Sequence, residues 1–146
     1  MKPGQETPDT KLFVDTSVWS LALRRDAPPD HPAVDRLGHA LTSGEHVFCT
    51  GLILQELLQG FRGPRDATSI VERFAAIPFI TPTRTDHVEA ANLRNACRRR
   101  GVQVGTVDAL LAYLCIAHEL VMLTTDRDFL GIAESTALTL WDRQVR

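Results

Sequence analysis

Four acidic residues lie beside apolar segments of the sequence, where an ionised carboxylate needs a specific partner. They are Asp15, Glu56, Asp108 and Asp126, and each one ends, interrupts or opens a run of aliphatic residues. A carboxylate next to core-forming sequence costs free energy unless something compensates its charge. Carboxylate oxygens from separate segments are the ligands that hard cations such as Mg²⁺ and Mn²⁺ prefer. The four residues therefore predict a metal site, provided that the fold brings their segments together.

Each of these acids also has an explanation that needs no metal. Asp15 could cap the helix that follows it, and Asp108 could be favoured by the dipole at the first turn of a helix. Glu56 could be a solvated position on an amphipathic helix, while Asp126 and Asp128 could be ordinary turn or cap residues. The joint placement favours the metal interpretation, because a cation needs several oxygen ligands from different elements.

The overall composition is that of an ordinary globular domain. The chain has 146 residues, of which 44% are hydrophobic and 23% charged, and this favours one domain with its own core. Its formal net charge of -2 argues against binding nucleic acid by bulk positive charge. A bound divalent ion and local arginines can still supply that attraction. Lysine occurs only at Lys2 and Lys11, which argues against mechanisms that need a lysine deep in the fold.

The cysteines and the N-terminal segment bear on the compartment. Cys49, Cys97 and Cys115 are far apart in the sequence, which predicts buried free thiols in a reducing compartment. No apolar stretch is long enough to span a bilayer, and residues 1–10 lack the apolar core of a signal peptide. We therefore expect a cytoplasmic protein with a flexible leader over 1–10 and one domain over 11–146.

Short apolar strands alternate with helices along the chain. Strands are predicted over 11–14, 47–49, 79–80, 121–123 and 138–140. Helices are predicted over 18–23, 33–41, 52–61, 66–76, 85–100, 107–117 and 126–134. Thr50 and Thr106 are expected to cap the helices that carry Glu56 and Asp108. This alternation is typical of an α/β fold with a largely parallel sheet, in which sites form beyond the carboxyl ends of the strands.

The ordered set of acidic motifs resembles the PIN-domain ribonucleases and, among them, the VapC toxins of bacterial toxin–antitoxin pairs. Four segments carry the resemblance, namely VDTSVW at 14–19, QELLQG at 55–60, VDALLA at 107–112 and TTDRDF at 124–129. It covers residues 12–141 and implies a PIN-like three-layer α/β/α fold with a central, mainly parallel sheet of four to five short strands. The polar leader departs from the family's usual start, in which the first strand begins almost at the initiator methionine.

The resemblance also implies roles for individual residues. The acidic quartet that binds Mg²⁺, with Mn²⁺ as a substitute, and acts in catalysis would be Asp15, Glu56, Asp108 and Asp126. Asp128 would be an auxiliary metal ligand or an orienting group, and Thr16 and Thr124 would be supporting hydroxyl donors. The candidates for contacts with RNA phosphates are seven arginines: Arg24, Arg25, Arg62, Arg65, Arg98, Arg99 and Arg100.

The activity that the resemblance implies is that of a metal-dependent endoribonuclease, the toxin of a toxin–antitoxin pair. It would hydrolyse RNA phosphodiester bonds and leave a 5′-phosphate and a 3′-hydroxyl. The implied partners are the RNA, a cognate antitoxin near Trp19, Leu21 and the helix over 52–61, and a second copy in a homodimer. The alternative is a PIN-like module that binds RNA or a partner without cutting. Whether tRNA, rRNA or mRNA is the target, and whether one or two ions bind, stays open.

Other protein classes with clustered acidic residues are excluded by particular residues of this sequence. A haloacid dehalogenase phosphotransferase needs a second aspartate two residues after the first, where this chain has Ser17. A response-regulator receiver domain needs a lysine after a late strand, and no lysine follows Lys11. The glycine signatures of P-loop and dinucleotide-binding folds are absent from the sequence.

Overall fold

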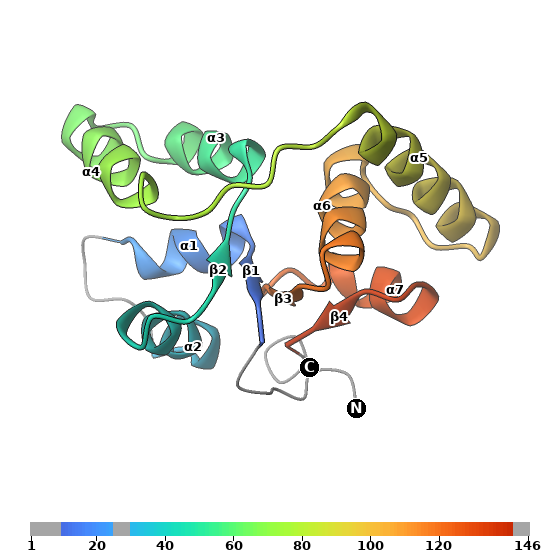
Figure 1. Cartoon of the computed structure of the whole chain (residues 1–146), viewed down its shortest axis with the longest axis horizontal. Coiled ribbons are helices and arrows are strands. Elements are labelled where there is room, and N and C mark those ends of the chain that lie inside the picture. The colour runs from blue at the N-terminus through green and yellow to red at the C-terminus, as the bar shows by residue number, and fades with distance from the viewer. Residues whose placement is uncertain (1–9, 25–29, 142–146) are drawn as a thin grey trace.

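Four parallel strands form a sheet in the order β2-β1-β3-β4 (Figure 1). The computed structural model describes residues 10–24 and 30–141. The strands are β1 (Leu12–Val14), β2 (Val47–Phe48), β3 (Val121–Leu123) and β4 (Thr139–Leu140). Leu12 pairs with Val47 on one side and with Val121 on the other. The α/β fold with a central parallel sheet that the sequence predicts is therefore confirmed.

Seven helices flank the sheet in the described part of the chain. They are α1 (Thr16–Ala22), α2 (Pro32–Thr42), α3 (Gly51–Gly60), α4 (Pro64–Phe74), α5 (Arg84–Arg99), α6 (Thr106–Ala117) and α7 (Asp128–Ser135). Figure 1 shows α1 to α4 gathered towards the β2 edge of the sheet, and α5 to α7 towards the β4 edge. The carboxyl ends of β1 and β3 therefore lie between the two groups of helices.

The core is built on β1 and α6. All three residues of β1 are fully buried, and the strand has a hydrogen-bonded partner on both edges. Helix α6 buries residues on several faces, as its nearly continuous apolar sequence predicts: Ala109, Leu110, Leu111, Ala112, Leu114 and Cys115. Burial of these two elements holds the residues at their ends, Asp15 and Asp108, in defined positions.

Some element boundaries differ from those that the sequence predicts. Residues 79–80 do not form a strand: Phe79 makes one isolated bridge to Cys49. The flanking Pro78 and Pro82 carry no N–H group, so the ladder cannot extend. Helix α4 begins at Pro64, two residues before its predicted start, because proline is well suited to the first helical position.

The remaining expectations concern thiols, membrane segments and the leader. Cys49, Cys97 and Cys115 are buried and free, as predicted, and burial raises the pKa of the Cys49 thiol to about 12. Among the residues that the structure describes, no helix has the length and apolar character needed to cross a bilayer. The leader expected over 1–10 lies, apart from Thr10, outside the described residues.

Candidate metal centre

The two central strands bring Asp15 and the segment after β3 to the same edge of the sheet. Val14 pairs with Leu123 in parallel register, and the Asp15 backbone N–H donates to the Leu123 carbonyl at 2.9 Å. Because both strands end at this level, the residues that follow them are neighbours in space. The structure thus places Asp15 beside Thr124, as the predicted strand ends require.

Asp15 is almost fully buried, with 7% of its surface exposed, and is held by hydroxyl donors. Its Oδ2 atom accepts hydrogen bonds from Ser17 Oγ at 2.7 Å and from Thr124 Oγ1 at 2.8 Å. The same carboxylate caps α1 by accepting from the Ser17 backbone N–H at 3.4 Å. Asp15 is therefore both the helix cap of the simpler explanation and a member of the acidic site.

Ser17 is a residue of this site that the sequence analysis did not assign to it. Besides donating to Asp15, its Oγ atom accepts from the Thr125 backbone N–H at 3.0 Å. The Asp126 N–H donates to Thr124 Oγ1 at 3.0 Å, and the Asp128 N–H donates to Asp126 Oδ1 at 2.9 Å. Two hydroxyls thus fix the loop that carries the last two carboxylates. The only signal in the sequence is the position of Ser17 two residues after Asp15.

The first turn of α6 presents Asp108 to this loop. Carboxylate oxygens of Asp108, Asp126 and Asp128 all lie within 4.8 Å of one another. Helix α6 begins after Gly105, which offers no side-chain cap, so the prediction that Thr106 caps it is wrong. Asp108 is therefore the acidic residue of an otherwise uncapped first turn, where the helix dipole favours a negative charge.

Four neighbouring acids act electrostatically on Asp108 at this site. The pKa of Asp108 is raised to about 6, first because burial desolvates its carboxylate and then because of neighbouring acids. In order of effect, these acids are Asp126, Asp15, Asp128 and Glu56. The structure therefore brings all the predicted acidic ligands into electrostatic reach of a single carboxylate.

Glu56 approaches the site from α3, as predicted, and is exposed to solvent. Its Oε1 atom accepts a hydrogen bond from Thr16 Oγ1 at 3.0 Å. Thr50 caps this helix by accepting from the Ile53 N–H, which agrees with the sequence prediction. The two threonines named from the resemblance thus both donate to acids, Thr16 to Glu56 and Thr124 to Asp15.

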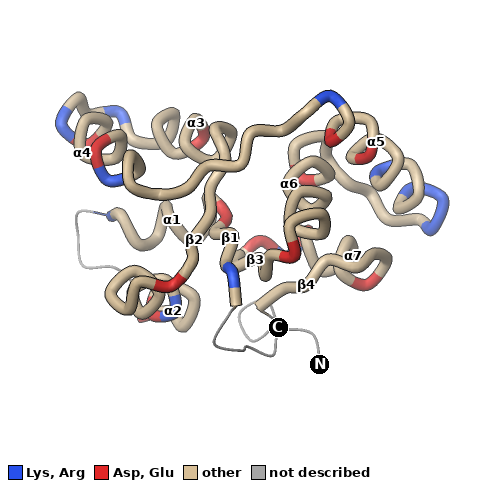
Figure 2. Tube along the Cα trace, viewed as in Figure 1, with Lys and Arg blue, Asp and Glu red and all other residues tan. Residues whose placement is uncertain are grey.

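The structure does not bring the predicted arginines together. Figure 2 shows basic residues on α4 and the loop before it at one end of the molecule, and on the C-terminal end of α5 at the other. Arg24 lines a separate small cavity between α1 and α4, and Arg25 lies outside the described residues.

The donor set fits a hard divalent cation. It consists of carboxylate oxygens without histidine or thiolate. None of the five carboxylates forms an ion pair with any basic side chain in residues 10–24 and 30–141. Clustered acids without a cationic partner repel one another, and a bound cation removes that repulsion.

The fold and the site together define a class of protein. It is an α/β domain with a parallel sheet and an acidic site at the carboxyl edge of its central strands. The chain belongs to the PIN domain family, because a sequence model of that family matches residues 12–135. The resemblance drawn from the motifs is therefore confirmed. No curated protein sequence matches the chain.

Solved structures show the same fold at low sequence identity. VapBC2 from Rickettsia felis, bound to a DNA fragment from its promoter, has a TM-score of 0.70 and 18% identity, with 90% of this chain and 97% of that chain covered. FitAcB from Neisseria gonorrhoeae has a TM-score of 0.65 and 19% identity, with 90% and 96% covered. VapC20 from Mycobacterium tuberculosis, a sarcin-ricin loop cleaving toxin, has a TM-score of 0.64 and 16% identity, with 88% and 99% covered.

Proposed function

We propose that this protein is a metal-dependent endoribonuclease that acts as the toxin of a toxin–antitoxin pair. The observation that carries the proposal is the convergence of five carboxylates from four segments of the chain without a basic partner among the described residues. Membership of the PIN domain family and the similarity to VapC structures support it. The proposed reaction is hydrolysis of an RNA phosphodiester: oxygen from water joins phosphorus, the bond to the 3′ oxygen breaks, and that oxygen takes a proton.

We assign Asp108, Asp126 and Asp128 as the residues that would hold Mg²⁺ or Mn²⁺, with Asp15 and Glu56 completing the charge of the site. A divalent cation supplies water activation and stabilises charge on the phosphate oxygens when bound. Ser17 and Thr124 hold the Asp15 carboxylate in one orientation. Glu56 is held at Oε1 by Thr16 and keeps its other oxygen available to accept a proton from the attacking water.

The nuclease proposal is tested by incubating the purified protein with total RNA and Mg²⁺ or Mn²⁺. We expect discrete cleavage that disappears with EDTA and in the Asp108→Asn variant. Asp35→Asn is the matched control, because Asp35 is an exposed acid on α2 whose side chain has no described hydrogen bond or ion pair. A folded, antitoxin-free wild type that is inert on every RNA would favour the alternative, a binding module. Cleavage of DNA in place of RNA would change the substrate.

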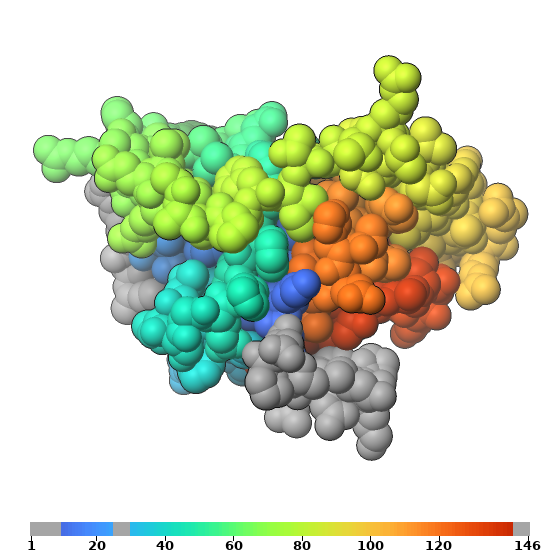
Figure 3. Space-filling view, in the orientation of Figure 1, coloured from blue at the N-terminus to red at the C-terminus, as the bar shows by residue number. Residues whose placement is uncertain are grey.

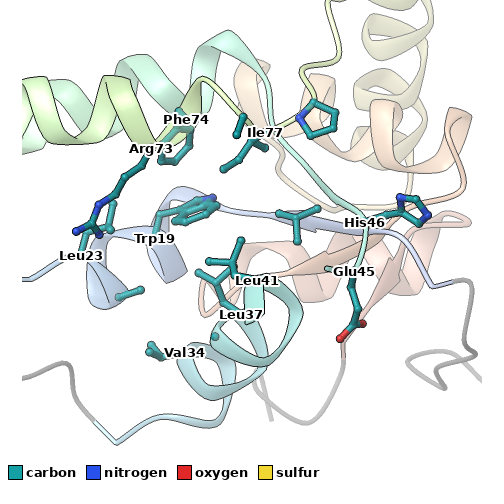
Figure 4. Close-up of a pocket in the computed structure, with 15 residues that line it drawn as sticks. Trp19, Leu23, Val34, Leu37, Leu41, Glu45, His46, Arg73, Phe74 and Ile77 are labelled. Carbon is teal, nitrogen blue, oxygen red and sulfur yellow. The ribbon is translucent and has the colours of Figure 1, made fainter. Parts of the chain in front are cut away.

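We further propose that the antitoxin inserts apolar side chains into a cavity between α1, α2 and α4. This cavity has a volume of about 580 Å³ and is lined mainly by apolar residues (Figure 4), including Trp19, Leu37, Leu41, Phe74 and Ile77. Figure 3 shows α1 at the bottom of the hollow between α4 and α2. The Trp19 side chain is 3% exposed, and its Nε1–H has no acceptor among the described residues.

This location differs in part from the predicted one, because α2 and α4 line the cavity in place of the helix over 52–61. Leu41→Glu, at a side chain that is 48% exposed, is expected to abolish co-purification with the proposed antitoxin. Val88→Glu on α5, 55% exposed and outside the cavity lining, is the control that should retain it. Equal capture by both variants would place the antitoxin elsewhere.

The remaining features of the proposal come from the resemblance. We propose a cytoplasmic homodimer whose PIN domain extends over 11–146, with residues 1–10 as a leader. Light scattering of the purified toxin measures its mass against the 16.2 kDa of one chain. A monomer at the concentrations used for cleavage would remove the dimer from the proposal without affecting the assignment of the site.

A further inference from the structure

A second cavity, of about 680 Å³, adjoins the candidate metal centre. It lies between the C-terminal half of α5, the turn after it and the start of α7, and its lining consists of Arg94, Arg98, Val102, Gln103, Val104, Gly105 and Asp128. Asp128 is also one of the three clustered carboxylates. The cavity therefore shares Asp128 with the acidic site, and two arginines, Arg94 and Arg98, also line it.

Arg94 is held in place by one hydrogen bond and keeps other donors available. Its Nε–H donates to the Val104 carbonyl at 2.7 Å, which fixes the plane of the guanidinium group. Within the described residues, Arg94 makes no other side-chain hydrogen bond or ion pair, so its two terminal nitrogens have no protein partner. A planar, pre-oriented guanidinium group with free donors suits a phosphate ligand.

Arg98 lies one helical turn after Arg94 and therefore on the same face of α5. It is exposed, and its side chain has no hydrogen-bond or ion-pair partner within 10–24 and 30–141. Neither arginine pairs with Asp128, although all three residues line the same cavity. The opposite charges are thus separated by open space, which a ligand can occupy.

The turn that forms the cavity wall is fixed at both ends. Gly101 adopts a φ of +79°, a conformation that favours glycine. The Gly101 N–H donates to the Arg98 carbonyl and the Val102 N–H to the Cys97 carbonyl, each at 2.9 Å, which makes a Schellman motif at the end of α5. Val102 in turn packs closely against Gly131 of α7.

We propose that this cavity binds the RNA strand adjacent to the phosphate that is cut, with Arg94 and Arg98 contacting backbone phosphates. Gln103, which is exposed in the same wall, is available to a ribose or base. A strand fits better than an isolated anion, because it places one phosphate at the carboxylates while its neighbours reach the arginines. The inference rests on the proposed nuclease function and assigns Arg94 and Arg98 as substrate-positioning residues.

The chain offers a matched pair of variants for the test. Arg98→Ala removes an arginine that lines the cavity, whereas Arg84→Ala removes an exposed arginine at the start of the same helix, which does not line it. We expect Arg98→Ala to raise KM by about tenfold or more with little change in kcat, since a charge-assisted hydrogen bond contributes about 1.5–3 kcal/mol. The Arg84→Ala variant should stay within about twofold of wild type, which is the size of effect expected from weak, screened surface charge.

A binding measurement separates this inference from the nuclease proposal. The probe is a labelled single-stranded RNA of mixed sequence in EDTA, so that no cleavage occurs. Arg98→Ala, but not Arg84→Ala, should weaken binding and reduce the slope of log affinity against log salt by about 0.7. Equal losses in both variants, or no binding by wild type, would overturn the cavity assignment even if the wild type cleaves RNA. Selective loss without cleavage by wild type would retain the cavity and reject the nuclease.

Discussion

Ser17 connects the two strand ends that form the candidate metal centre through a single oxygen atom. It donates to Asp15 Oδ2 at 2.7 Å and accepts from the Thr125 N–H at 3.0 Å. Thr124 makes a parallel connection, from Asp15 to the Asp126 N–H. Because such hydrogen bonds are partly buried, the loss of one partner leaves the other group unsatisfied. The positions of the carboxylates therefore depend on two uncharged side chains.

The Ser17→Ala variant tests this dependence. We expect a loss of about 1–3 kcal/mol of unfolding free energy, because the Thr125 N–H loses its acceptor. RNA cleavage should fall by about tenfold or more, since Asp15 is no longer held by this hydroxyl. Ser20→Ala is the control on the same helix, because the Ser20 side chain makes no hydrogen bond in the described residues. If the two variants unfold at the same urea concentration, the connection has no energetic importance.

The Asp108→Asn variant should be more stable than wild type in the absence of metal. The pKa of Asp108 is raised to about 6 by burial and by neighbouring acids, from an ordinary value of about 3.9. The folded protein therefore binds more protons than the unfolded chain between these values, and stability falls as pH rises through this range. Because Asp108 is partly exposed, solvent screening weakens this effect. The gain in unfolding free energy of Asp108→Asn at pH 7 is therefore on the order of 1 kcal/mol.

Urea unfolding in EDTA at about pH 4 and pH 7.5 measures this difference, since the two values bracket the shifted titration. The stabilising effect of Asp108→Asn should be present at the higher pH and nearly absent at the lower. An offset that is the same at both pH values would show that the substitution acts through packing and not through charge.

At the scale of elements, α5 positions both the arginine-lined cavity and the entry to α6. It begins with a capping box: Thr83 Oγ1 accepts from the Asp86 N–H at 3.2 Å, and the Thr83 N–H donates to Asp86 Oδ2 at 2.8 Å. It ends in the Schellman motif at Gly101. Between these ends it packs mainly on α6, the helix that carries Asp108. The caps thus fix where α5 begins and ends, and its packing on α6 sets the face that is turned to the cavity.

Thr83→Ala should destabilise the protein by about 1 kcal/mol through loss of the cap. For a domain of this size, the melting temperature should fall by about 2–4 °C. RNA cleavage well below that temperature should be unchanged, because the cap lies at the other end of α5 from the cavity. Thr85→Ala, an exposed residue of the same first turn without a described hydrogen bond, is the control. Equal melting temperatures for the two variants would contradict a role for the capping box.

At the scale of the whole molecule, folding assembles a concentration of negative charge that the local sequence does not contain. The chain carries a net charge of only -2, but five acids from distant segments act on one another at the edge of the sheet. Their repulsion opposes the folded state, and a ligand that binds only the folded state offsets it. Metal binding and stability should therefore be coupled.

Mg²⁺ or Mn²⁺ should raise the melting temperature of the wild type. At a free metal concentration 100 times the dissociation constant, linkage predicts an increase of about 2.7 kcal/mol in the free energy of unfolding. The increase should be smaller at about pH 5 than at pH 7.5, because a proton on Asp108, whose pKa is about 6, competes with the cation. Differential scanning fluorimetry with a metal titration measures both effects. Asp108→Asn should lose the increase and Asp35→Asn should keep it, while an equal increase in both would place the bound cation elsewhere.

The sequence by itself determined the elements and the acidic set. Strand β1 and helix α6 follow from local apolar patterns, because burial of those side chains is their main source of stability. Asp15, Glu56, Asp108 and Asp126 could be selected because an acid beside such patterns needs compensation. Residues 79–80 show the limit of this reasoning, since a suitable apolar pair forms only one bridge when prolines flank it.

Only the tertiary structure decided which polar groups meet. Ser17 and Thr125 are 108 positions apart, and their hydrogen bond depends on the register of β1 against β3. In the same way, the path of the chain separates the arginines of α4 from those of α5. It also directs Arg94, which no motif contains, into a cavity beside the acids. Helices and strands can be predicted from local apolar patterns, because burial of those side chains stabilises them. A hydrogen bond or a charge pair depends on distances between atoms that only the assembled sheet defines.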